Sequence, residues 1–258
     1  MDKSFQFPDP IHQFQISDLF HVGNVGGANI AFTNSALFMA LAVALLTLFL
    51  VGGTLRAQTV PSRLQSAAEL TYEFVADMLR STAGKEGMRF FPFVFTIFMF
   101  VLTLNMFGII PYAFSVTSHI IITAALALTV FFTVLIYGVY RHGLHFFNLF
   151  VPKGVPIYIL PMIVGIEILS FISRPISHSV RLFANMLAGH IALKVFAGFI
   201  IMLAAALGAL GWASGVLPFA MIIALTALEM LVAFLQAYVF AILTCIYLND
   251  ALNLHAHH

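Results

Sequence analysis

The chain has 258 residues, of which 62% are hydrophobic and only 8% are charged, and its mean hydropathy is +1.04. A soluble protein of this length would carry far more charged residues, so the composition excludes that class and indicates an integral membrane protein with several spans. The net charge of +1 gives no electrostatic basis for binding nucleic acid. The single cysteine, Cys245, excludes an internal disulfide, and no Cys or His cluster has the spacing of a zinc site.

Residues 1–33 form a polar arm that lacks the basic start and apolar run of a signal peptide, so we expect no cleaved leader. The first membrane span is predicted at residues 36–55, because about 20 apolar residues cross the hydrocarbon core. In residues 60–80, apolar side chains recur every three or four positions, and in a helix the charged side chains would lie on the other faces. That pattern predicts an amphipathic helix on the membrane surface.

A helical hairpin follows, with spans predicted at residues 91–110 and 119–140 and a tip without Lys or Arg. Asn105 in its first span is expected to hydrogen-bond between helices. The next apolar stretch, residues 158–205, would make a helix of about 70 Å, more than twice the bilayer core. It is either two spans or one long tilted helix. Its polar residues recur at three- and four-residue steps on one face, which a turn would interrupt, so we favour one continuous helix.

The last span is predicted at residues 216–247, so that residues 156–248 form a long helical hairpin. Basic residues occur in alternate links only: Arg56, Arg63, Arg80, Lys85, Arg89, Arg141 and Lys153. The positive-inside rule then places the N-terminal arm outside and the C-terminus in the cytoplasm. The predicted fold class is an all-α integral membrane protein. It is one membrane domain over residues 1–258, with five membrane helices and one amphipathic surface helix.

Arg181 lies well inside the long apolar stretch, where a charged side chain costs about 2.5 to 3.5 kcal/mol, so it must face protein or water. One interpretation is a structural ion pair within the bundle. Glu167 is about 21 Å away along a continuous helix, too far to pair, which leaves Glu229 on the last span. If Glu229 is engaged elsewhere, we expect the partner of Arg181 to be a carboxylate on another subunit.

His190 is the other candidate partner of Glu229. It lies about 13 Å beyond Arg181 toward the outer surface, on the opposite side of the helix. A carboxylate and an imidazole on facing helices can share a proton near neutral pH, which suits a relay. A buried and satisfied polar pair is the simpler interpretation. Gln236, seven residues after Glu229, falls on the same helix face.

Polar residues in the inner half of the long helix can line water down to the cytoplasm. A single serine there usually bonds to its own backbone, and an arginine beside a proline can simply snorkel. As one stripe that includes an acid, however, the set indicates a polar route: Glu167, Ser170, Ser173, Arg174, Ser177 and His178. A second route leads from outside through Glu229, His190 and Gln236. Arg181 between the two routes would repel a cation that tried to pass directly.

Two segments, SVRLFANMLAGH (179–190) and ALEMLVAFLQAYVFAILTCIYL (227–248), resemble the subunit a family of rotary F-type ATP synthases. This family is the stator half of a proton-translocating membrane motor. The likeness covers residues 62–248 and includes the amphipathic helix and the long helical hairpin. The arm with its PDPIHQF segment (8–14) is similar to forms from proteobacteria related to mitochondria.

The resemblance implies a role for individual residues. Arg181 matches the essential stator arginine of the family, and Asn185 and Gln236 match polar residues beside it. Glu167 matches the acid of the cytoplasmic half-channel.

His190 and Glu229 match an acid and imidazole pair whose members exchange positions in some relatives. In such a motor, a proton enters near this pair and neutralises a carboxylate on the c-ring, which can then enter lipid cheaply. The resemblance thus implies a stator subunit of the Fo motor that is no enzyme on its own and holds no nucleotide, cofactor or metal. It also implies a hetero-oligomeric complex with the c-ring and peripheral-stalk b-type subunits, in a bacterial inner membrane rather than a mitochondrial one.

Two other classes of protein also place charged or histidine side chains inside a membrane. A secondary transporter with Arg181 at an anionic substrate would show internal repeats and broken spans in matching positions, which the sequence does not. A membrane haem protein would need two histidines that project from facing helices toward one ring. Only His119 is available for that purpose outside the long helix, which carries His178 and His190.

Overall fold

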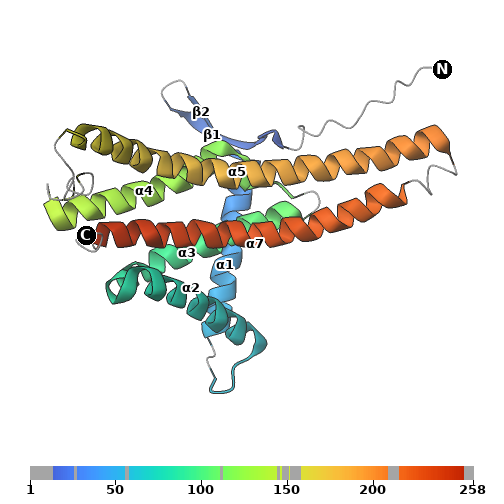
Figure 1. Ribbon diagram of the computed structural model, residues 1–258. Coiled ribbons are helices and arrows are strands. Elements are labelled where there is room, and N and C mark those ends of the chain that lie inside the picture. The colour runs from blue at the N-terminus through green and yellow to red at the C-terminus, as the bar shows by residue number, and fades with distance from the viewer. Residues whose placement is uncertain are drawn as a thin grey trace. The chain divides into compact units, whose positions relative to one another are not determined.

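The computed structural model describes residues 14–25, 28–55, 58–110, 113–143, 146, 151, 158–208 and 215–252. Figure 1 shows its strands and helices in chain order. The start of the polar arm, Arg56, Lys153 and the break before the last span lie outside the described residues. The chain divides into two compact units. The first unit comprises Met1–Val43, Leu102–His119 and Leu182–Gln236, and the second comprises Ala44–Val101, Ile120–Arg181 and Ala237–His258.

The polar arm contains two strands that the sequence analysis did not predict. Strand β1 (Asp18–Val25) pairs antiparallel with strand β2 (Ala28–Thr33), and the register runs from Asp18 opposite Thr33 to Val25 opposite Ala28. In the sequence, a Gly-Gly pair separates the two runs, which is a recognised signal for a β-hairpin. Of the residues that the structure describes in the arm, those from Asp18 to Val25 and from Ala28 to Thr33 are therefore in strands.

Helix α1 (Asn34–Thr54) confirms the first predicted span. Its start is fixed by side chains, since Thr33 Oγ1 accepts a hydrogen bond from the Ala36 amide at 3.3 Å and Asn34 Oδ1 accepts one from the Ser35 amide at 2.8 Å. Such bonds satisfy the amides that a helix leaves unpaired in its first turn.

Helix α2 (Arg63–Gly87) is the predicted amphipathic helix, and Ser62 caps it by accepting a hydrogen bond from the Gln65 amide at 3.3 Å. It extends past the predicted end at Arg80. Its helical geometry is interrupted at Gly84, where φ is +66°, a backbone angle that glycine adopts without steric cost.

The remaining spans agree with the prediction to within a few residues. Short 3₁₀ turns, η2 (Met88–Phe90) and η3 (Val116–Ser118), precede two of them. The helices are α3 (Phe91–Ile109), α4 (Ile120–His142), α5 (Leu160–Leu207) and α7 (Val216–Leu252). Helix α5 is continuous through Pro175, as the polar periodicity favoured. Within the described residues, five helical stretches are long and apolar enough to cross a membrane.

Helices α5 and α7 each carry a buried seam at three- and four-residue steps. The seam of α5 contains Phe171, Pro175, His178, Leu182, Met186 and His190. The seam of α7 is lined by small residues at Ala233, Ala237 and Ala241, and the only cysteine of the chain, Cys245, is also buried there. Small residues let helices approach closely in a membrane. The seams therefore determine which polar residues of each helix face protein.

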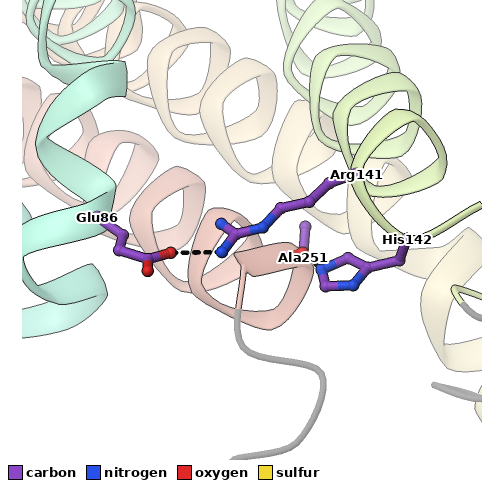
Figure 2. Close-up of polar contacts among 4 residues, drawn as sticks. All are labelled: Glu86, Arg141, His142 and Ala251. Atoms are coloured by element: carbon purple, nitrogen blue, oxygen red, sulfur yellow. Dashed lines mark hydrogen bonds and ion pairs between the residues drawn. The ribbon is translucent and has the colours of Figure 1, made fainter.

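In the second unit, polar contacts connect the ends of several helices (Figure 2). The Arg141 Nη2 of α4 lies 2.6 Å from the Glu86 Oε2 of α2, and the His142 Nε2 lies 3.1 Å from the carbonyl oxygen of Ala251 on α7. Aromatic contacts join α2 to its neighbours as well, since the ring of Phe74 lies 5.7 Å from that of Phe98 and 5.8 Å from that of Tyr238.

Candidate functional site

The first unit brings His190 of α5 and Glu229 of α7 together, as the sequence analysis expected. The His190 Nδ1 lies 3.2 Å from the Glu229 Oε1, and the two side chains are only 9% and 5% exposed. An imidazole and a carboxylate can exchange a proton near neutral pH, and this contact brings the two groups within the distance that such an exchange needs, although neither oxygen of Glu229 forms a hydrogen bond with a described residue. The pair is therefore a candidate for proton transfer.

Two glycines make room for this pair, and the sequence analysis did not single them out. A Cβ at Gly189 would lie 2.8 Å from the Glu229 Oε1. A Cβ at Gly108 would lie 3.2 Å from the His190 Nε2 and 3.0 Å from the Ser115 Oγ. Two features of the sequence could have pointed to them: Gly189 directly precedes His190, and Gly108 lies inside an otherwise apolar span.

Asn105 is buried on α3, and its Nδ2 donates a hydrogen bond to the carbonyl oxygen of Ala233 on α7 at 3.1 Å. This confirms the predicted hydrogen bond between helices. Ala233 is one turn beyond Glu229 on the buried seam of α7. The bond therefore fixes α3 against α7 close to the acid.

Arg181 and Asn185 are exposed on α5, outside the buried seam, and Gln236 on α7 is partly exposed. Within its own unit, Arg181 forms no ion pair with any acidic residue that the structure describes. Glu229 is engaged by His190. With Glu229 engaged by another residue, the sequence predicts that the partner of Arg181 is a carboxylate on another subunit.

Arg174 has a partner that the sequence analysis did not anticipate. Its Nη1 lies 2.9 Å from the Asp250 Oδ2, and the two side chains are 23% and 15% exposed. Its guanidinium also lies 5.1 Å from the ring centroid of Tyr247 and 5.6 Å from that of Phe171. Arg174 therefore holds α5 against the end of α7. Its place in the inner route remains a prediction.

The other members of the inner stripe are divided between two environments. Ser170, Ser173 and Ser177 are exposed, and the Ser173 hydroxyl donates to the carbonyl oxygen of Ser170 at 2.7 Å. His178 instead is buried, with its ring centroid 3.8 Å from that of Phe240. His178 therefore lies on the buried seam of α5 rather than beside the exposed serines, and its place in the inner route remains a prediction.

Glu167 is partly exposed and forms no ion pair within the described residues of its unit. It lies toward the start of α5, ahead of the exposed serines. Its role in the inner route remains a prediction.

The three histidines weighed as haem ligands have separate neighbours. His190 contacts Glu229 and His178 contacts Phe240, whereas His119 stacks on Phe114 with ring centroids 5.0 Å apart. His119 precedes α4 outside the membrane-spanning helices, and burial lowers its pKa. A neutral imidazole is therefore favoured in this loop.

Comparison with known proteins identifies the family of the chain. The sequence model described as ATP synthase A chain matches residues 36–249. Three relatives named ATP synthase subunit a are similar over 95% of this chain and 98% of their own length. They are 66% identical in Bradyrhizobium diazoefficiens, 68% in Rhodopseudomonas palustris and 65% in Nitrobacter winogradskyi. This all-α, multi-pass membrane protein therefore belongs to the ATP synthase A chain family.

Proposed function

We propose that this chain is the proton-translocating stator subunit of the Fo motor of an F-type ATP synthase, and that Arg181 separates two half-channels that open on opposite sides of the membrane. The observation that carries the proposal is the contrast between the two charges. Glu229 is buried against His190, whereas Arg181 is exposed and lacks an acidic partner among the described residues of its unit. An exposed arginine inside an apolar helix must face water or protein, and an anion from another subunit would compensate its charge.

The surroundings of Arg181 suit a helix that carries such an anion. Besides Asn185, the exposed residues that lie one or two turns from it on the same face of α5 are small: Ser173, Ser177, Ala184 and Ala188. Small residues allow the backbone of a partner helix to come close. The proposed partner is the c-ring, whose carboxylates would pass Arg181 in turn.

In this proposal, protons from outside reach the c-ring through Glu229 and His190, with Gln236 and Asn185 beside the path. A protonated carboxylate is neutral and can move into lipid, whereas an ionised one is held back by the cost of burying its charge. Protons leave toward the cytoplasm near Glu167 and the exposed serines of α5. Arg181 stabilises the emptied carboxylate and prevents a direct passage, so that proton flow requires rotation.

The proposed setting follows from the same arrangement. The membrane in the proposal is a bacterial inner membrane, and the distribution of basic links supports an N-terminal arm outside and a C-terminus in the cytoplasm. The chain would act in a complex with the c-ring and peripheral-stalk subunits and would bind no nucleotide itself.

The test is a pair of proton measurements on inverted membrane vesicles that carry the whole complex with Arg181→Ala. ATP-driven acidification should be abolished, while passive proton flux should persist or increase because the barrier is gone. Arg80→Ala is the control, since Arg80 is exposed on α2 and only contacts Asp77 at 3.6 Å, an arrangement that contributes little. Unchanged acidification in Arg181→Ala would show that this arginine is merely structural.

A further inference from the structure

Only one of the two ring nitrogens of His190 contacts Glu229, and the other, Nε2, faces away from it. The Nε2 is buried and forms no hydrogen bond with any described residue. A buried polar atom without a partner is costly and is often satisfied by an ordered water. The residue that lies against this nitrogen is Gly108, whose Cβ, if present, would be 3.2 Å away.

A pair of hydroxyl groups lies on the same side of Gly108. The Ser115 Oγ is 3.0 Å from the position of that absent Cβ, and it is hydrogen-bonded to the Ser118 Oγ at 2.7 Å. Both serines are buried, with exposures of 6% and 3%. They belong to the connection between α3 and α4, which contains no Lys or Arg and is assigned to the outer side.

We propose that Ser118, Ser115 and the His190 Nε2 form the outer end of the proton path, with water bridging the space beside the bare Cα of Gly108. This inference rests on the proposed function and assigns an entrance to the outer half-channel. The distances allow it, because one water can bond atoms about 2.8 Å away on each side. The path runs from the α3–α4 connection to Glu229.

The proton balance of this path is simple. Each hydroxyl accepts a proton on an oxygen lone pair and gives up its own, so it carries no net charge afterwards. His190 accepts a proton at Nε2 and releases the one on Nδ1 to the Glu229 carboxylate. The imidazole is then left with its proton on Nε2, so the ring must turn about its Cβ–Cγ bond to present that proton to Glu229 and a bare nitrogen to the water before the next proton arrives. No other reactant is needed.

The test compares Gly108→Ala, Ser115→Ala and the double variant in vesicles that carry the complete complex. Passive proton flux is measured after removal of the soluble ATPase sector, together with ATP-driven acidification before removal. Each single variant should lower the flux about tenfold. The double variant should be little worse than either single one, because both changes break the same connection.

Thr117→Val is the matched control. Thr117 is buried in the same 3₁₀ turn, and its hydroxyl has no hydrogen-bond partner among the described residues. Its removal should leave the flux near that of the unaltered chain. Ser118→Thr, which keeps a hydroxyl, should retain more flux than Ser118→Ala. The amount of subunit in the membrane is measured for each variant. If Gly108→Ala fails to accumulate there, the proton flux of Ser115→Ala alone tests the proposed entrance.

Three results would overturn the inference: normal flux in Ser115→Ala, additive losses in the double variant, or a loss in Thr117→Val equal to that in Ser115→Ala. Glu229→Ala separates this inference from the proposed function. If Glu229→Ala blocks flux but Ser115→Ala does not, the relay stands and only this entrance is wrong. If neither variant changes the flux, the proton-relay function of this side is wrong as well.

Discussion

The carboxylate of Glu229 occupies space that any side chain at position 189 would need. A Cβ there would lie 2.8 Å from the Oε1, closer than nonbonded atoms tolerate, and overpacking of this kind costs about 1 to 3 kcal/mol. The acid would have to move, and its contact with His190 at 3.2 Å would be lost. Position 189 therefore constrains proton transfer without taking part in it.

We predict that Gly189→Ala reduces ATP-driven acidification in vesicles about tenfold, because a shift of about 1 Å in a reacting group can be this costly or more so. Gly165→Ala is the control on the same helix. Beyond the adjoining residues and the backbone of its own turn, no described atom lies within 4 Å of a Cβ at Gly165, and alanine is the better helix former by up to about 1 kcal/mol. Normal acidification in Gly189→Ala would show that Glu229 tolerates displacement.

At the scale of the element, α2 depends on one side chain for its first turn. The Ser62 hydroxyl accepts the Gln65 amide, and loss of such a cap typically costs about 1 kcal/mol. We predict that Ser62→Ala increases hydrogen exchange in the first turn of α2 about fivefold. Ser66→Ala, inside the same helix, should leave exchange nearly unchanged. Equal exchange in both variants would show that Ser62 does not stabilise this helix start.

The end of α7 is held by a partly buried ion pair between Arg174 and Asp250. Removal of one partner leaves a charge without compensation, whereas removal of both can be nearly neutral. We predict that Asp250→Ala lowers the melting temperature of the detergent-solubilised complex and that Arg174→Met combined with Asp250→Leu recovers most of the loss. If the double variant melts as early as the single one, the pair is not the source of the stability.

At the scale of the whole molecule, the distribution of basic residues predicts the orientation of the chain. A fluorescent protein that folds only in the cytoplasm should be fluorescent when fused after residue 258. The same fusion after residue 118, in the link without Lys or Arg, should remain dark. The opposite pattern would reverse the topology and would exchange the outer and inner routes.

Length and periodicity predicted much of the molecule. The spans came from the length of the apolar stretches. Periodicity gave the continuity of α5 and made His190 one of two candidate partners of Glu229, because side-chain spacing along a helix fixes which face each residue occupies. It did not predict the partner of Arg174, since a contact with Asp250 links residues far apart in sequence. Nor did it reveal the room at Gly108, because space depends on neighbours from another helix. The β1–β2 pair was missed because its Gly-Gly signal is short.

Cys245 has a practical consequence for mapping this protein. It is the only cysteine in the sequence, and its exposed fraction is 0%. Reactive thiols are at least partly accessible, so the native chain should give almost no background with water-soluble thiol reagents. A cysteine introduced at an exposed site such as Ser177 can therefore be labelled selectively. The water-accessible surface of each helix can then be charted without altering the native sequence elsewhere.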